Sequence, residues 1–279
     1  MSITVNTNMQ ALRIQTNLSA ATGKMNTAME RMSSGSKINS AKDDAAGLAV
    51  STKLSTTISS SKVASNNVAI GSNLLDTAEG TLDVVNSNLQ RIRDLTEQAS
   101  NGTYSTSDLK AIAAEVTARI TEVDAIAASS NFNGTKLFAG GSGVTLQVGT
   151  GSADSLKLDS TIFATVNMAT ALTGLSAAIT AAVSSTTAAF LDTIDSSMAG
   201  ITTRITNIGA GQNQLEAVAD GLNVQQTNLS AAKSTITDAD IAQESASFVQ
   251  QQILQQASAS LLVQANSAPQ IALTLIKGQ

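Results

Sequence analysis

Residues 73–103 read NLLDTAEGTLDVVNSNLQRIRDLTEQASNGT and contain the clearest structural signal in the chain. Small and apolar residues recur there in alternating steps of three and four, the spacing that keeps one face of a helix against a partner helix. The same register extends back to Leu54 without a slip, although its first half is weakly apolar. The positions of this repeat are Leu54, Thr57, Ser61, Ala64, Val68, Gly71, Leu75, Ala78, Leu82, Val85, Leu89, Ile92, Thr96 and Ala99. Such a helix spans roughly 70 Å, whereas a compact sphere of this chain length has a radius of gyration of only ~19 Å. The stretch therefore predicts an elongated rod.

The seven-residue repeat returns in three other segments. One runs from Leu109 to Ile126 and begins near Thr106 or Ser107, and a second runs from Ile194 to Ile236. The third lies near the N-terminus and uses small or thin residues at Ala11, Ile14, Leu18, Ala21, Met25, Ala28 and Met32. Sustained heptads indicate packed helices with a left-handed supercoil.

Two regions interrupt the helices. The segment SNGTY (residues 100–104) is predicted to be a helix–helix turn, with Asn101-Gly102 as its signal. In residues 129–160, Asn133-Gly134, Gly140-Gly141 and the alternation in VTLQV and SLKL predict short β-hairpins. Residues 161–189 are rich in Ala, Thr and Ser and are predicted to be mostly helical.

The order of the elements mirrors itself along the chain. A thin helix, a long rod helix, the hairpin region, a second long rod helix and a thin helix follow one another. The simplest fold brings the two ends together. The predicted fold class is therefore mainly α, an elongated coiled-coil helical bundle with a small β-hairpin region and with the N- and C-terminal helices packed together.

The C-terminal tail has an unusual composition. Residues 245–276 read SASFVQQQILQQASASLLVQANSAPQIALTLI and contain no charged side chain. A helix on a protein surface needs one apolar stripe and tolerates charges elsewhere. A helix without charges is therefore predicted to be covered by protein on every side. A single short N-terminal helix cannot supply that cover. We therefore expect the tail to be disordered in the isolated chain and to become helical against other copies or a partner.

Composition excludes several functions. The 279 residues carry a net charge of −5, and no basic cluster suggests nucleic-acid binding. Cysteine and histidine are absent, which removes disulfides, thiolate chemistry, the commonest general base and the commonest metal ligand. The N-terminus, MSITVNTNMQALRIQ, has neither a basic segment nor an apolar core, so we expect no secretory signal. Glutamines interrupt the tail, so we expect no membrane insertion.

Several long segments resemble bacterial flagellins. They are ERMSSGSKINSAKDDAAGLAV (residues 30–50), the stretch 73–103 quoted above, NFNGTKLF, and the C-terminal QQILQQASASLLVQANSAPQIALTLI. The resemblance covers about residues 1–140 and 190–279. It implies a structural subunit that polymerises into the flagellar filament, the helical propeller of swimming bacteria. Only residues 141–189 are left for outer domains, so the chain resembles a short flagellin that lacks large ones.

The resemblance also implies a domain organisation and a set of partners. Residues 1–40 would be the N-terminal part of the terminal-helix (D0) domain with its linker. Residues 41–236 would be the rod (D1) domain, with the hairpin region at about 129–160 and a short variable segment at 141–189. Residues 237–279 would complete D0. The chain would be exported unfolded by the flagellar type III apparatus into the extracellular filament, without a cofactor. Its partners would be identical copies, sister flagellins, an export chaperone on the C-terminal tail, and the cap and hook-junction proteins.

Candidate contact residues follow from the tail and from the resemblance. Ala41–Gly47 (AKDDAAG) links the thin helix to the rod, and two interpretations stay open: Ser40 or Asp43 caps the rod helix, or the segment is a subunit contact. Paired carboxylates at Asp43 and Asp44 without a third ligand or a histidine do not suggest a metal or a catalytic site. The expected polymerisation contacts are Leu18, Met25, Met32, Asp43, Asp44, Phe248, Ile253, Leu261, Leu262, Ile271 and Leu275.

Three further residues match positions that flagellins present to a vertebrate innate receptor. They are Arg91, Leu95 and Glu115, which could equally serve filament packing. Arg91 and Arg93 could also pair with Asp94 and Glu97 within their helix, for ~0.3–0.5 kcal/mol each. Thr96-Glu97 stands where strongly recognised members usually have small apolar residues, and a carboxylate there could leave a desolvated charge, so we expect weaker recognition of this chain.

Two other functions compete with that of a filament subunit. A hook–filament junction protein or another flagellin-related axial component would share the terminal helices. A secreted enzyme on a flagellin frame would need an inserted catalytic domain or a zinc motif with histidines, which this chain lacks. We therefore expect no enzyme.

Overall fold

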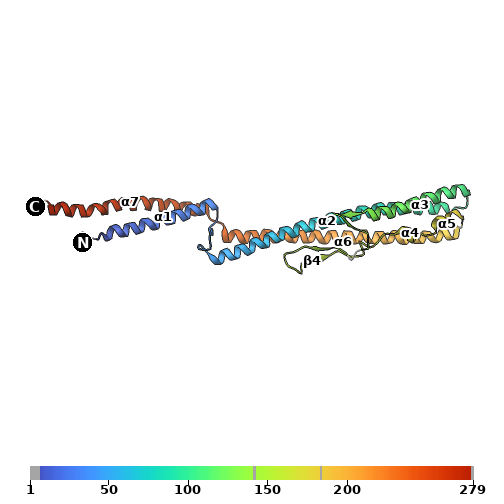
Figure 1. Cartoon of the computed structure of the whole chain (residues 1–279), viewed down its shortest axis with the longest axis horizontal. Helices are drawn as coiled ribbons and strands as arrows, with labels where there is room; N and C mark the ends of the chain where they lie inside the picture. The colour runs from blue at the N-terminus through green and yellow to red at the C-terminus, as the bar shows by residue number, and fades with distance from the viewer. Residues whose placement is uncertain (1–6, 141–142, 183, 278–279) are drawn as a thin grey trace. The chain divides into compact units, whose positions relative to one another are not determined.

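The computed structural model describes residues 7–140, 143–182 and 184–277, and the side chains of residues 184–185 and 268–277 lie outside that description. Long helices dominate it (Figure 1). The helices are α1 (Met9–Ser34), α2 (Ala45–Ala99), α3 (Thr106–Ser129), α4 (Met168–Ala171), α5 (Leu175–Thr180), α6 (Ser184–Thr237) and α7 (Ile241–Lys277). The strands are β1 (Asn131–Phe132), β2 (Thr135–Lys136), β3 (Thr145–Gln147) and β4 (Ser155–Lys157). The prediction of a mainly α fold with a small hairpin region is confirmed.

The chain divides into two compact units. Residues 58–227 form the rod unit, and residues 1–57 together with 228–279 form the terminal unit. The terminal unit joins the two ends of the sequence, because α1 and α7 lie side by side (Figure 1). The predicted packing of the N- and C-terminal helices is confirmed.

The heptad of α2 forms the spine of the rod unit. Every predicted seam position from Ser61 to Ala99 is buried, and Leu75, Leu82 and Leu89 have no exposed surface. Helix α3 contributes Val116 and Val123 to this core. Helix α6 contributes Ile194, Ile201, Ile208, Leu215 and Leu222. Within the rod unit, α2 runs for residues 58–99, which is about 63 Å at 1.5 Å per residue. The periodicity of the sequence therefore identified this core correctly.

Local signals set the turns of the rod unit as expected. Ser105 caps α3 in a reciprocal arrangement with Asp108, in which each side chain accepts from the backbone N–H of the other residue. The β1–β2 hairpin turns at Asn133-Gly134, whose φ angles of 49° and 81° are both positive. A two-residue turn of this kind matches the twist of paired strands.

The second hairpin packs on α2 at a glycine. Strands β3 and β4 are antiparallel, with Leu146 opposite Leu156. A Cβ atom at Gly71 would collide with the Leu146 side chain. Asn67 on α2 also donates a hydrogen bond from Nδ2 to the Gln147 carbonyl at 3.0 Å. The hairpin therefore lies close to the α2 backbone because Gly71 has no side chain.

The segment between β4 and α6 belongs to the rod core more fully than its sequence suggests. Its buried side chains are Leu158, Ile162, Phe163, Val166, Met168, Leu172, Leu175, Ala178 and Ile179. Asp124 of α3 caps α4 from a distance, accepting from the N–H groups of Met168 at 2.6 Å and Ala169 at 2.9 Å. Arg204 of α6 donates to the carbonyl of Ala164 at 2.7 Å. Burial of Arg204 lowers the pKa of its guanidinium. The prediction that residues 161–189 are mostly helical is confirmed for α4, α5 and the start of α6, while residues 161–167 are non-helical.

Candidate assembly site

The helices of the terminal unit are paired through a thin seam. In α1 only Ala21 and Ala28 are buried, and in the described side chains of α7 only Gln251 is. Polar groups bridge the pair: Asn8 donates from Nδ2 to the Ala265 carbonyl at 2.8 Å, and Gln255 donates to the Thr22 hydroxyl at 3.1 Å. Two alanines and a few hydrogen bonds stabilise a helix pair far less than the core of the rod unit does, because apolar burial contributes about 25 cal/mol per Å².

Large apolar side chains are exposed mainly in the terminal unit. Of fourteen such side chains in the described chain, four (Val63, Ile70, Val84 and Val224) belong to the rod unit, which leaves ten in the terminal unit. These ten are Met9, Leu12, Met29, Val50, Ile241, Val249, Ile253, Leu254, Leu261 and Val263. A concentration of exposed apolar side chains in one part of a protein in water is typical of an interaction site.

The predicted tail contacts fall into two groups. Phe248 and Leu262 are half-buried, while Ile253 is 60% exposed and Leu261 is 56% exposed. Ile271 and Leu275 lie on the helical backbone of α7, but their side chains are outside the described part of the structure. The expectation that α7 is disordered in the isolated chain stays a prediction; the structure describes this segment as a helix beside α1.

The predicted contacts on α1 lie on its seam. Leu18, Met25 and Met32 are half-buried, and Met32 accepts a hydrogen bond at Sδ from the Ser245 hydroxyl at 3.3 Å. The heptad positions Ala21 and Ala28 are the buried residues of α1, and the roles of Leu18, Met25 and Met32 as subunit contacts stay predictions. The heptad missed the exposed residues outside the seam, of which Val263 is the most exposed at 72%. In α7 these exposed residues lie within the uncharged stretch 245–276, and that absence of charge was their only signal in the sequence.

The junction between α1, α2 and α7 is held by backbone hydrogen bonds. Helix α1 ends at Gly35, which has a φ of 70°, a conformation that glycine adopts without strain. Ser36 pairs with Asp238 in a short antiparallel bridge. The Ala239 N–H donates to the Gly35 carbonyl at 3.0 Å, and the Lys37 N–H donates to the Thr237 carbonyl at 2.8 Å. The segment that follows α1 is thus bound to the chain between α6 and α7.

The aspartates of this junction act as helix and turn caps. Asp44 caps α2, since its Oδ1 accepts from the Gly47 N–H at 2.9 Å. Asp43 turns the other way and accepts at Oδ2 from the N–H and hydroxyl of Ser40 at 2.9 and 3.0 Å. Asp240 caps α7 by accepting from the Ala242 N–H at 2.9 Å. The cap interpretation is therefore correct in kind, but Asp44 rather than Ser40 or Asp43 caps the rod helix. Both Asp43 and Asp44 are exposed, and their role as subunit contacts stays a prediction.

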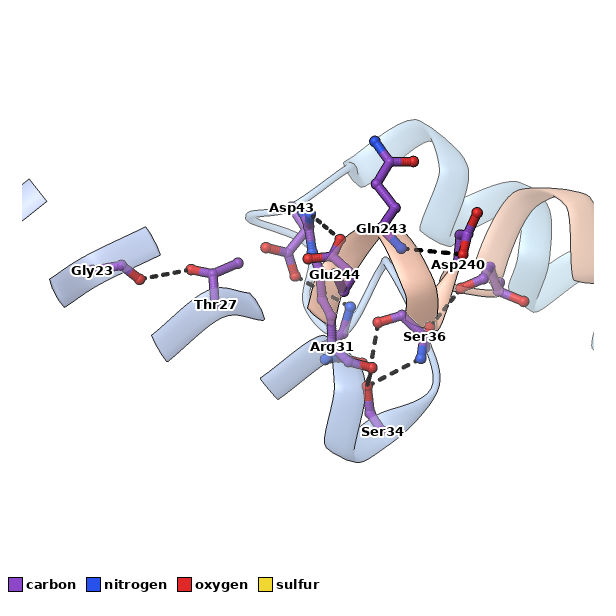
Figure 2. Close-up of polar contacts among 11 residues, drawn as sticks. Gly23, Thr27, Arg31, Ser34, Ser36, Asp43, Asp240, Gln243 and Glu244 are labelled. Atoms are coloured by element: carbon purple, nitrogen blue, oxygen red, sulfur yellow. Dashed lines mark hydrogen bonds and ion pairs between the residues drawn. The ribbon is translucent and has the colours of Figure 1, made fainter. Parts of the chain in front are cut away.

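An ion pair joins α1 to α7 at the same place. Arg31 Nη1 lies 3.2 Å from Glu244 Oε1, with 32% and 17% of the two side chains exposed. Figure 2 shows Arg31 and Glu244 directed toward each other, with Asp43 beside them. A pair this far from solvent is screened less than a fully exposed one. It therefore helps to fix where α7 begins along α1.

Hydrogen bonds lower the pKa of two junction carboxylates. The Ser40 hydroxyl and then the N–H groups of Ser40 and Asn39 hold the pKa of Asp43 below its ordinary 3.8, and Arg31 adds a smaller effect. The hydroxyls of Ser234 and Thr237 lower the pKa of Asp238 in the same direction. A lowered pKa means that these two carboxylates bind a proton more weakly in the folded state than in the unfolded state. Their contribution to the stability of the fold is therefore fully present at a pH above the ordinary pKa of aspartate, and it is lost as the pH falls through the lowered pKa.

Replacing both aspartates with asparagine should therefore change the pH dependence of the junction. We expect the Asp43→Asn/Asp238→Asn chain to melt at a lower temperature than the wild type at neutral pH. The difference should shrink below about pH 4, where the wild-type carboxylates also become protonated. Circular dichroism melting curves of both chains between about pH 7 and about pH 3 measure this. A difference that stays constant over the whole range would contradict it.

The three candidate receptor residues lie in the rod unit, on α2 and α3. Arg91 Nε and Nη2 both contact Glu115 Oε1 at 3.1 Å, so this pair joins α2 to α3 and is not intrahelical. Arg93 does pair within α2, with Glu97 at 3.2 Å, and it also binds Asp195 of α6 at 2.7 Å. Leu95 is only 2% exposed and belongs to the rod core. The structure therefore brings Arg91 and Glu115 together on the surface and places Leu95 beneath it.

Neither a metal-binding group nor a membrane-spanning helix is found among the residues that the structure describes. No group of three or more Asp and Glu in that part of the chain could hold a metal ion. Among the helices so described, none is long and apolar enough to cross a membrane.

Family models and full-length relatives both match flagellins. Residues 5–142 match the model of the bacterial flagellin N-terminal helical region, and residues 191–276 match that of the C-terminal helical region. The flagellin of Halalkalibacterium halodurans is 38% identical over 275 residues, which are 98% of this chain and 99% of that protein. The flagellin of Xenorhabdus nematophila is also 38% identical, over 99% of this chain and all of its own length.

Solved structures show the same fold. A chain assigned as a flagellar hook-associated protein of Vibrio parahaemolyticus superposes with a TM-score of 0.63 at 17% identity, covering 70% of this chain and all of that one. The FlgL structure of Bacillus cereus superposes with a TM-score of 0.52 at 22% identity, covering 64% and 97% of the two chains. At these identities the likeness concerns the fold alone. The two family models and the full-length relatives together place the chain in the bacterial flagellin family, whose members are structural subunits of the flagellar filament.

Proposed function

We propose that the terminal unit is the polymerisation site of this flagellin and that identical copies cover its exposed apolar surface in an extracellular filament. The observation that supports this is the contrast between the two units. The rod unit buries its own heptad seam, whereas the terminal unit buries only Ala21, Ala28 and Ile38 among its described apolar side chains and leaves ten large ones exposed. A head-to-tail contact of this kind does not close on itself and produces an open helical assembly.

The uncharged stretch of α7, residues 245–276, suits such an assembly. Gln and Ser side chains can hydrogen-bond across a close interface, and they avoid the cost of burying an unpaired charge. Gln255 already donates to Thr22 of α1 in this way. The same apolar surface would have to be shielded before export, which supports an export chaperone on the C-terminal tail. Sister flagellins, the cap and the hook-junction proteins would meet the same terminal unit, and recognition by the vertebrate receptor would be weak.

A charge placed on this surface tests the proposal. We expect Ile253→Asp and Leu261→Asp to raise the critical concentration for filament growth at least about a hundredfold, because an unpaired buried carboxylate costs several kcal/mol and each 1.4 kcal/mol is a factor of ten. Ile253→Leu is the matched control and should polymerise like the wild type. Sedimentation of filaments over a range of protein concentrations measures the effect. Normal growth of both aspartate variants would refute the proposed surface.

The second candidate is a hook–filament junction protein or another axial component with the same fold. The likeness to hook-associated structures at 17% and 22% identity favours it only at the level of the fold. Electron microscopy of purified, concentrated chain separates the two. Long filaments composed of this chain alone support the filament subunit, and short or absent oligomers support the junction protein.

A further inference from the structure

The methionines of this chain are concentrated on one helix. The chain has seven, of which Met9, Met25, Met29 and Met32 are on α1, while only Met168 and Met198 belong to the rod unit. Cysteine, tryptophan and histidine are absent from the sequence. A thioether is therefore the side chain that hydrogen peroxide oxidises most readily in this protein.

Three of these methionines form a cluster beside α7. Met25, Met29 and Met32 are spaced at i, i+4 and i+7, which places them on one side of α1. Met29 is 49% exposed, and Met25 and Met32 are half-buried on the seam. The contact between Met32 Sδ and the Ser245 hydroxyl places Met32, one member of the methionine cluster (Met25, Met29 and Met32), against α7.

The other described methionines differ from the cluster in their surroundings. Met168 is 9% exposed, so a peroxide molecule reaches it less easily, and Met198 is half-buried against the rod core, outside the terminal unit. Met9 is 54% exposed at the start of α1, four turns or more away from the cluster. These three residues are therefore natural controls for the cluster.

We infer that the methionine cluster is an oxidation site that decides whether a subunit can join the filament. This inference rests on the proposed function, because it requires that identical copies cover the terminal unit. In a free subunit the thioether sulfur attacks one oxygen of hydrogen peroxide, the O–O bond breaks, and a sulfoxide and water form. The sulfur loses two electrons and the peroxide gains them.

The product disfavours assembly for a physical reason. A sulfoxide replaces a flexible apolar group with a polar, chiral one, which disrupts methionine-rich contacts. At Met25 and Met32 the added oxygen would widen a seam whose fully buried α1 residues are alanines. At Met29 it would place a strong acceptor on surface that is apolar in the free subunit. In a formed filament the same sulfurs are covered and react slowly. Methionine sulfoxide reductases would restore the free subunit.

Treating the full-length monomer with hydrogen peroxide tests the inference. The peroxide is removed, sulfoxides are located by peptide mass spectrometry, and growth on filament seeds is measured. We expect the critical concentration to rise about tenfold or more, as for a polar group buried without a partner, and methionine sulfoxide reductase to reverse the rise. In filaments treated alike, sulfoxide should form in the cluster at least about tenfold more slowly, because only dissociated subunits expose it.

Leucine variants assign the effect to the cluster. Methionine and leucine have similar volumes, and exchanging them usually costs little stability. Whatever the critical concentration of the untreated Met25→Leu/Met29→Leu/Met32→Leu variant, we expect peroxide treatment not to raise it. The control variants Met9→Leu and Met168→Leu/Met198→Leu should stay as sensitive as the wild type.

Several outcomes would overturn the inference. Oxidised wild-type monomer that polymerises normally would do so, and so would a triple-leucine variant that remains sensitive to peroxide. Should the triple variant fail to polymerise at all, partly oxidised wild-type monomer decides the matter: cluster sulfoxides depleted from the filaments support the inference, and equal amounts in filament and supernatant refute it. Failure of the untreated wild type to polymerise would instead refute the proposed function.

Discussion

Removal of residues 245–279 is expected to abolish filament growth and to leave a soluble, folded rod unit. The deletion takes away nearly all of α7 and its exposed Ile253, Leu254, Leu261 and Val263. It touches none of the rod core, whose described members all lie between Ala64 and Leu222. The truncated chain should stay monomeric at concentrations where the full chain polymerises completely.

Two measurements on the truncated chain separate loss of assembly from loss of folding. Urea unfolding followed by circular dichroism should give a transition for the rod unit with the same midpoint as in the full-length monomer, because the rod core is intact. Sedimentation and electron microscopy should find no filaments. A truncated chain that still grows normal filaments would remove α7 from the set of intersubunit contacts.

The second large effect is expected in the rod core. Leu82 has no exposed surface and lies at a seam position of α2. Leu82→Ala should lower the free energy of unfolding of the rod unit by about 2–5 kcal/mol, through lost burial and the cavity that remains. Chemical denaturation of the full-length monomer measures this loss.

A neighbouring residue on the same helix serves as the matched control. Val84 is 47% exposed, and Val84→Ala should change the free energy of unfolding by less than about 0.5 kcal/mol. Equal losses for the two variants would mean that the α2 heptad does not form the core in solution.

The heptads predicted the rod because the period of an α-helical seam is a local property of the sequence. Seam positions of α2 from Ser61 onward are all buried, and the turns at Asn101-Gly102 and Asn133-Gly134 use residues that favour tight turns by themselves. The interior of the rod between β4 and α6 escaped this reasoning. Its side chains are buried against distant parts of the chain, since α4 and α5 pack on α3, and Asp124 and Arg204 hydrogen-bond to its backbone. Residues 158–182 show no periodicity that predicts these partners.

In the candidate assembly site, the heptad indicated the seam between α1 and α7 but not the exposed apolar surface. The heptad of α1 selected Leu18, Met25 and Met32, which lie on the seam with α7 and are already half-buried within one chain. The residues with the most exposed apolar surface, such as Val263 and Ile253, lie off that seam. The heptad of α1 reports the side of this helix that faces α7, and it does not report apolar surface on the other sides of the two helices. Only the absence of charge in residues 245–276 indicated this exposed apolar surface.

Hydrogen exchange of the monomer and of the filament tests most directly whether the terminal unit depends on assembly. In a dilute monomer, amides of α1 and α7 should exchange fast, since local opening is easy where little apolar surface is buried, while amides at the α2 seam near Leu82 and Leu89 should exchange slowly. In the filament, α1 and α7 should become as protected as that seam. Monomeric α1 and α7 that already exchange as slowly as the rod core would contradict the account.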